Sequence, residues 1–89
     1  MNIITKKIDR EWFDMIIAGK KKFELRLADF EISDGDTIRL EEWTNDTERK
    51  FTGRYIEKKV TYARKVDLKS WTKRQPEILE KGFYVIQFD

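Results

Sequence analysis

Three ionisable side chains follow a glycine at the spacing Gly19-x-Lys21-x-x-Glu24-x-Arg26, and they are the first candidates for chemistry. Arg26 could form a bidentate contact with a phosphate or a base edge, and Lys21 could meet a phosphate as a point charge. Glu24 could orient either cation or accept a hydrogen bond from an exocyclic amine such as cytosine N4. The same residues could instead form a ladder of exposed ion pairs, worth less than about 1 kcal/mol per pair. Their place after a helix-ending glycine favours a site.

Other side chains with binding chemistry lie further along the chain. Trp43, at the end of a predicted strand, could stack a base or serve as a core or lid residue. Arg54 and Lys58 could hold backbone phosphates, since cations are the usual phosphate contacts. Trp71 lies between two lysines and is a further stacking candidate. We therefore expect ligand contacts from both halves of the sequence.

The composition restricts catalysis and metal binding. The chain has no cysteine and no histidine, which excludes a thiolate nucleophile, a thiolate zinc site and the commonest general base. If the protein is an enzyme, Lys21 and Glu24 are the catalytic candidates, with Lys21 acting as base or nucleophile. Turn and strand spacing accounts for the acidic residues from 34 to 42 without a metal. We expect neither a metal nor a cofactor.

Length and charge distribution limit the kinds of protein this can be. Eighty-nine residues predict a single domain over 1–89, and 40% charged residues predict a well-hydrated surface. No run of about 18 apolar residues and no signal-peptide pattern occur, so we expect a cytoplasmic monomer without membrane contact. Residues 24–48 hold nine acids and two bases, net −7, and residues 49–74 hold ten bases and two acids, net +8. This polarity suits a basic face for phosphates, or strands that point charge to water.

The hydrophobic patterns predict a mixed fold. Asp9 is expected to cap a helix that Gly19 ends, with Trp12 and Phe13 assigned to packing. Strands are expected over residues 2–5, 23–27, 37–43, 51–66 and 83–88, and a short second helix over 76–81. The last strand is apolar at both parities, as for burial on two faces. These elements predict an α+β fold: a small barrel of about five strands with one main N-terminal helix.

Strand parity raises one question about the charged residues. Phe23 and Leu25 share one face of the strand over 23–27, and Glu24 and Arg26 share the other. Lys21 has the wrong parity to join them in a regular strand. If Lys21 does point at this pair, the strand must begin irregularly or with a bulge.

The spacing of these residues resembles the signature of the ASCH superfamily, the activating-signal-cointegrator homology domains, which have a PUA-like fold. The resemblance extends to four further segments, at residues 12–20, 35–43, 52–62 and 82–86. The chain is similar to a branch of short, uncharacterised bacterial and phage proteins. The resemblance implies a pseudo-barrel with flanking helices.

The resemblance also implies a function: binding of RNA or a modified nucleotide in a cleft lined by Lys21, Glu24 and Arg26. A few small members of the superfamily resemble amidohydrolases acting on N4-acetylcytidine, with a lysine where Lys21 stands and a threonine where Glu24 stands. Here a glutamate replaces that hydroxyl. Three hypotheses follow: an RNA- or nucleotide-binding module, a small hydrolase of N4-acylcytidine type, and a protein-interaction module.

Overall fold

The computed structural model describes residues 1–44, 46–66 and 81–89. The elements in chain order are β1 (Ile3–Asp9), α1 (Arg10–Ile17), β2 (Phe23–Leu27), β3 (Thr37–Trp43), β4 (Phe51–Val66) and β5 (Phe83–Phe88). Four of the five predicted strands have the expected bounds, whereas β1 continues to the residue before the helix. The second helix expected over 76–81 and Trp71 lie outside the described residues, apart from Lys81 at the end of that range.

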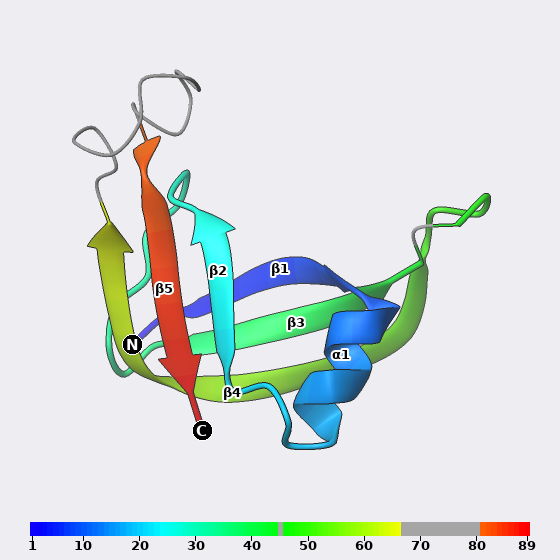
Figure 1. Ribbon diagram of the computed structural model, residues 1–89, viewed down its shortest axis with the longest axis horizontal. Helices are drawn as coiled ribbons and strands as arrows, with labels where there is room; N and C mark the ends of the chain where they lie inside the picture. The colour runs from blue at the N-terminus through cyan, green and yellow to red at the C-terminus, as the bar shows by residue number, and fades with distance from the viewer. Residues whose placement is uncertain (45, 67–80) are drawn as a thin grey trace.

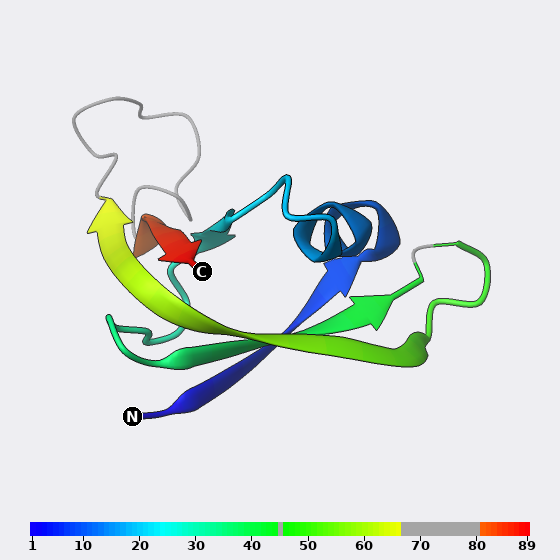
Figure 2. The same ribbon diagram turned by 90° about the horizontal axis from the view of Figure 1, so that it is seen from below.

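The five strands form one mixed sheet with the order β1-β3-β4-β5-β2, in which only β1 and β3 run parallel. β4 is long enough to belong to two parts of the sheet. Its first half pairs with β3 and its second half pairs with β5. Between these halves the strand curves strongly, so that the β2–β5 part stands across the β1–β3 part (Figures 1 and 2).

The sheet does not close, so the prediction of a barrel is wrong. β1 and β2 are the two edges, and no ladder joins them. A ladder requires strands about 4.8 Å apart and roughly aligned, whereas β2 crosses the direction of β1 (Figure 1). A side chain bridges the two edges instead: the Arg26 guanidinium donates to the Lys7 carbonyl at 2.7 Å.

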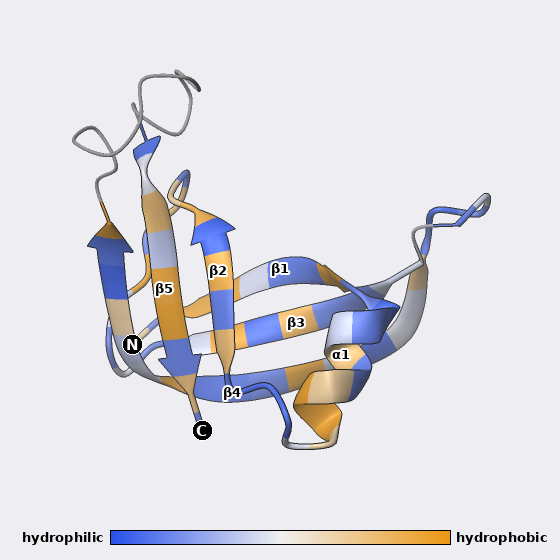
Figure 3. Cartoon of the chain, viewed as in Figure 1, coloured by the Kyte–Doolittle hydropathy of each residue, from blue (hydrophilic) through white to orange (hydrophobic). Residues whose placement is uncertain are grey.

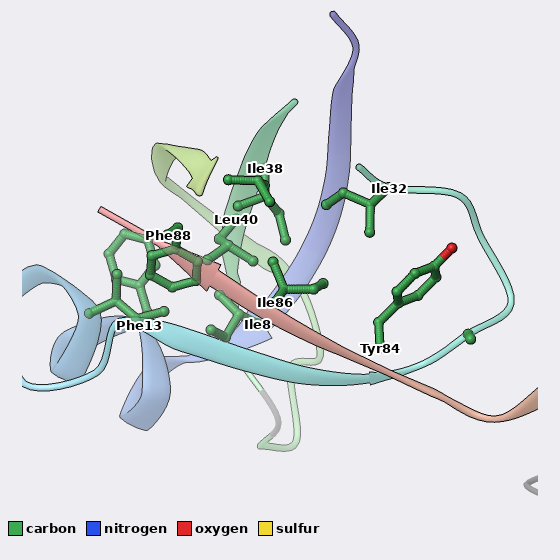
Figure 4. Close-up of a cluster of buried hydrophobic side chains, with 11 residues drawn as sticks. Ile8, Phe13, Ile32, Ile38, Leu40, Tyr84, Ile86 and Phe88 are labelled. Carbon is green, nitrogen blue, oxygen red and sulfur yellow. The ribbon is translucent and has the colours of Figure 1, made fainter. Parts of the chain in front are cut away.

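The hydrophobic core lies inside the fold of the sheet and extends under α1 (Figure 4). Phe13 and Ile16 are the two buried residues of the helix, and their three-residue spacing places them on one face. They meet side chains from β1, β3 and β5, since strand residues of one parity point inward. The buried apolar residues are Ile8, Phe13, Ile16, Ala28, Ile32, Ile38, Leu40, Val60, Tyr84, Ile86 and Phe88.

The polar face of β2 is buried and its apolar face is exposed, the reverse of what hydrophobicity suggests. The alternation is confirmed, but Glu24 is the buried residue, while Phe23 and Leu25 are 53% and 60% exposed. On β5 one parity is buried, yet Val85 is 39% exposed, so the expected burial on both faces is also wrong. Figure 3 shows the apolar positions of β2 and β5 next to each other. The polar row of β2 therefore faces the interior of the folded sheet.

Candidate functional site

A Schellman turn at the end of α1 sets the position of Lys21. The Lys20 N–H donates to the Met15 carbonyl and the Gly19 N–H to the Ile16 carbonyl, both at 3.0 Å. Gly19 has φ +76°, a left-handed conformation that favours glycine. β2 begins only at Phe23, so Lys21 precedes the strand and escapes its alternation. Lys21 therefore reaches Glu24 from before the strand, and β2 pairs with β5 without the bulge that was considered.

A substitution at this turn should have a modest effect on stability. We expect Gly19→Ala to lower the free energy of unfolding by about 1 kcal/mol, because the left-handed conformation costs a β-carbon roughly 1–2 kcal/mol. An added methyl group would meet no other atom within 4 Å, so the cost is conformational and not steric. Urea denaturation measures it. A loss above about 3 kcal/mol would show that the turn tolerates no distortion.

Glu24 is the buried centre of the charged cluster. Its side chain is 5% exposed, and its two oxygens accept from two different cations. Lys21 Nζ donates to Oε1 at 2.6 Å, and Arg26 Nε donates to Oε2 at 2.8 Å. Charge-assisted hydrogen bonds of this length are the strong ones. The three residues expected from the sequence therefore converge, and they do so around an inward-facing carboxylate.

A hollow of about 400 Å³ lies beside this cluster, between the two open edges of the sheet and the start of α1. Its lining comes from the end of β1, the first turn of the helix, Lys21 and the strand β2. The lining residues are Lys7, Ile8, Asp9, Trp12, Lys21, Phe23, Glu24, Leu25 and Arg26. The hollow is open to water, and it is where the sheet fails to close.

The free edge of β2 adds backbone groups to this lining. The Lys22 carbonyl accepts from the Phe88 N–H at 3.0 Å, so the even-numbered residues of β2 bond to β5. Successive residues of a strand direct their backbone groups to opposite edges. The N–H and C=O groups of Phe23 and Leu25 therefore point away from β5, toward the hollow. They offer a ligand both donors and acceptors.

Two aromatic rings border the hollow, and the sequence did not single out either as a binding residue. Trp12 was assigned to packing but is 41% exposed, because it lies one step away from the buried stripe of α1. Phe23 is the second ring. Lys21 Nζ lies 4.8 Å from the Trp12 ring centroid and 5.5 Å from that of Phe23, both within cation–π range. An alternating pattern on β2 with Glu24 buried would have predicted that Phe23 is exposed.

Three other predicted binding residues, Trp43, Arg54 and Lys58, lie outside this hollow. Trp43 packs edge-on against Phe51 at 4.9 Å, and Lys7 Nζ lies 4.5 Å from the Trp43 ring centroid. Lys58 is half-buried on β4, where it pairs with Ile38 of β3. These residues have side chains that can bind a ligand, but they do not lie beside the Glu24 cluster.

Arg54 belongs to a second charged cluster, around the fully buried Glu42. The Arg54 guanidinium donates to both Glu42 oxygens, and it also donates to Asp14 of α1 at 3.0 Å. Thr52 Oγ1 donates to the same carboxylate, and Arg10 Nε lies 3.5 Å from it. The cluster fastens the helix to β3 and β4. Arg54 therefore holds the helix that carries Trp12.

These contacts shift the protonation of the second cluster. The Arg54 hydrogen bonds lower the pKa of Glu42 from 4.5 to about 2, against the opposing effect of burial. Glu42 and then Asp14 raise the pKa of Arg54 above its ordinary value. Glu42 is thus ionised throughout the neutral range. Within residues 1–44, 46–66 and 81–89, no group of three acidic side chains forms a metal site.

Fold and site together define a small, open, five-stranded sheet protein with a polar hollow between its edge strands. The chain belongs to the family described as a domain of unknown function, DUF3850, which matches residues 5–75. It is 37% identical over 65 residues to an uncharacterised 12.9 kDa protein encoded in the GpA 3′ region of Escherichia phage P2. That match covers 73% of this chain, and this chain spans only 55% of the length of the phage protein.

A solved structure has a similar fold. The crystal structure of the hypothetical protein PH0355 superimposes with a TM-score of 0.65, covering 100% of this chain and 98% of the other. The two sequences are 19% identical, so the likeness concerns the fold alone. In the part of the chain that the structure describes, no helix has the length and apolar character needed to cross a bilayer.

Proposed function

We propose that this chain is an ASCH-type, PUA-like module that binds RNA or a nucleotide in the hollow between β1 and β2. One observation carries the proposal: the three charged side chains of the Gly19-x-Lys21-x-x-Glu24-x-Arg26 spacing converge beside a single water-accessible hollow. Ordinary ion pairs on a strand surface join exposed side chains, whereas Lys21 and Arg26 both pair with a buried carboxylate.

The cluster is arranged to keep cations ready for an anionic ligand. A lysine ammonium has three donors and a guanidinium has five. Lys21 gives one to Glu24, and Arg26 gives one each to Glu24 and the Lys7 carbonyl. Among the described residues the remaining N–H groups have no acceptor, so they could meet phosphate or base oxygens at the hollow. Because Glu24 fixes both cations, less side-chain entropy is lost on binding.

The geometry favours binding over hydrolysis. Both oxygens of Glu24 already accept hydrogen bonds from cations, and this pairing suits a carboxylate that positions Lys21 and Arg26. Lys21 donates to that carboxylate at 2.6 Å, an arrangement suited to an ammonium group and not to a neutral nucleophile. The hydrolase hypothesis predicts turnover of N4-acetylcytidine that disappears in Lys21→Ala. The binding proposal predicts no turnover.

Three consecutive lysines allow a matched test of the proposal. Lys21→Gln should weaken binding of single-stranded RNA by about 2 kcal/mol, the range for a lost hydrogen bond to a charged group. Lys20→Gln and Lys22→Gln remove the same charge from exposed positions outside the hollow and should change affinity little. Fluorescence anisotropy with a labelled oligoribonucleotide, at several salt concentrations, measures all three.

The salt series gives a second readout. Affinity should fall as salt rises, and Lys21→Gln should reduce the slope by about one released ion, because phosphate binding is driven by counterion release. Equal losses in all three lysine variants would reduce the effect to nonspecific attraction. A binding constant that does not change with salt would contradict phosphate recognition.

A further inference from the structure

Asp9 is the one carboxylate at the hollow that has no partner among the described residues. It was expected to cap α1, yet its side chain makes no capping hydrogen bond. The Asp9 carboxylate also forms no ion pair with any described residue. Glu24, the other carboxylate of the lining, already accepts hydrogen bonds from Lys21 and Arg26. The hollow therefore has one committed acceptor and one free acceptor.

The charges of the lining suit a ligand with few negative charges. Two cations, Lys21 and Arg26, face two carboxylates, Asp9 and Glu24, whereas the Lys7 ammonium lies over the Trp43 ring, outside the hollow. A phosphodiester of a single-stranded chain carries one negative charge and suits such a lining. A nucleoside triphosphate would bring several more charges than the lining can match.

We propose that Asp9 selects guanine within the RNA or nucleotide ligand, an inference that rests on the function proposed above. An ionised carboxylate can only accept hydrogen bonds. Guanine presents two adjacent donors, N1–H and the N2 amine, which match the two oxygens of Asp9. Adenine and cytosine place a ring acceptor beside their amine, and uracil places a carbonyl on each side of its single N–H. Those acceptors would face the carboxylate and be repelled.

The rest of the lining completes the recognition of such a base. Lys21 retains two ammonium donors after its bond to Glu24, and they suit the O6 acceptor next to N1 of guanine. The exposed rings of Trp12 and Phe23 offer surfaces for stacking a purine. Arg26 has guanidinium donors left for the phosphate. Each part of the ligand then meets a group of opposite hydrogen-bonding character or charge.

Inosine allows a sharp test, because it differs from guanosine only by the missing N2 amine. Oligouridine carrying one central guanosine, inosine, adenosine or cytidine is titrated into the full chain at a fixed salt concentration. We expect the guanosine oligomer to bind about tenfold more tightly than the inosine oligomer, within the discrimination of a bidentate pair. In Asp9→Asn this preference should disappear, while affinity for the adenosine oligomer should stay constant or rise.

Asn is itself a favoured N-cap residue, so Asp9→Asn should leave α1 folded. The matched control is Glu11→Gln, which removes the same charge from an exposed position in the first turn of α1, outside the lining. Equal affinities for guanosine and inosine, or an equal loss in Glu11→Gln, would overturn the role of Asp9 and leave the proposed function intact. Failure of the wild-type chain to bind any oligomer would overturn both.

Discussion

Glu24→Ala should lower the free energy of unfolding by about 3 kcal/mol, the lower part of the range for breaking a buried ion pair by removing one partner. Glu24 is 4% exposed and holds Lys21 and Arg26, whose side chains are only 15% and 24% exposed. Without the carboxylate, two cations remain close together with little access to water. Urea denaturation at neutral pH measures the loss.

A matched pair of residues on β3 gives the control. Glu41 accepts from Arg39 at 3.0 Å, but both side chains are about one third exposed, at 32% and 29%. Glu41→Ala should therefore cost less than about 1 kcal/mol, the usual value of an exposed pair. Similar losses in the two alanine variants would mean that burial of Glu24 adds nothing to its ion pairs.

The same substitution should also remove ligand binding, and a milder variant separates this effect from stability. Glu24→Gln keeps the volume of the side chain and one carbonyl acceptor, but it loses the charge that orients Lys21 and Arg26. We expect it to remain folded at 25 °C and to bind RNA at least about tenfold more weakly than the wild type, since positioned charge-assisted hydrogen bonds are worth about 1.5–3 kcal/mol. Undiminished affinity would place the ligand elsewhere on the molecule.

The sequence predicted the strands well because their signals are local. β3, β4 and β5 are alternating or apolar runs bounded by turn residues, and their expected bounds agree with the structure. Gly19 was recognised from its position after an apolar stripe. Closure of the sheet is not a local property, since it depends on whether β1 reaches β2. Nothing in either strand encodes the crossing angle that keeps them apart, and the barrel was expected wrongly for that reason.

The residues of the charged cluster could be predicted from the sequence, but the face of β2 that is buried could not. A period of two places Glu24 and Arg26 on one face, without saying which face is buried. Apolar Phe23 and Leu25 would be the usual choice for the interior, yet Glu24 is buried because two cations neutralise it. The exposure of Phe23 follows from that reversal, because Phe23 lies on the opposite face of β2. Asp9 was predicted as a cap from residue type alone, which fixes its place but not its hydrogen bonds.

The Glu42 cluster was invisible to sequence reasoning because its members are distant. Glu42 is 12 residues from Arg54, and Arg54 is 40 residues from Asp14, so no short motif contains them. Arg54 was predicted as a phosphate contact because cations are the usual phosphate contacts. The structure instead commits most of its donors to two carboxylates. Long-range pairing of this kind requires the sheet register, which the sequence does not provide.

This cluster should make stability depend on acid in a way that can be assigned to one residue. The pKa of Glu42 is about 2 in the folded protein and 4.5 ordinarily, so the carboxylate contributes stability that is fully present above pH 4.5. As pH falls from 4.5 toward 2, the unfolded chain takes up the proton first and the contribution is lost. At 1.36 kcal/mol per pKa unit, its size is about 3 kcal/mol.

Glu42→Gln should therefore unfold about 3 kcal/mol more easily than the wild type at pH 7, and the difference should shrink toward zero near pH 2. Urea denaturation of both proteins between these pH values measures it. Comparing the two proteins at each pH cancels the acid loss from Asp36, whose pKa is also lowered by the N–H groups of Asn2 and Ser33. Glu48→Gln, which breaks an exposed pair with Lys50, should change stability little at any pH. A Glu42→Gln difference that stays constant from pH 7 to pH 2 would assign the effect to packing and not to charge.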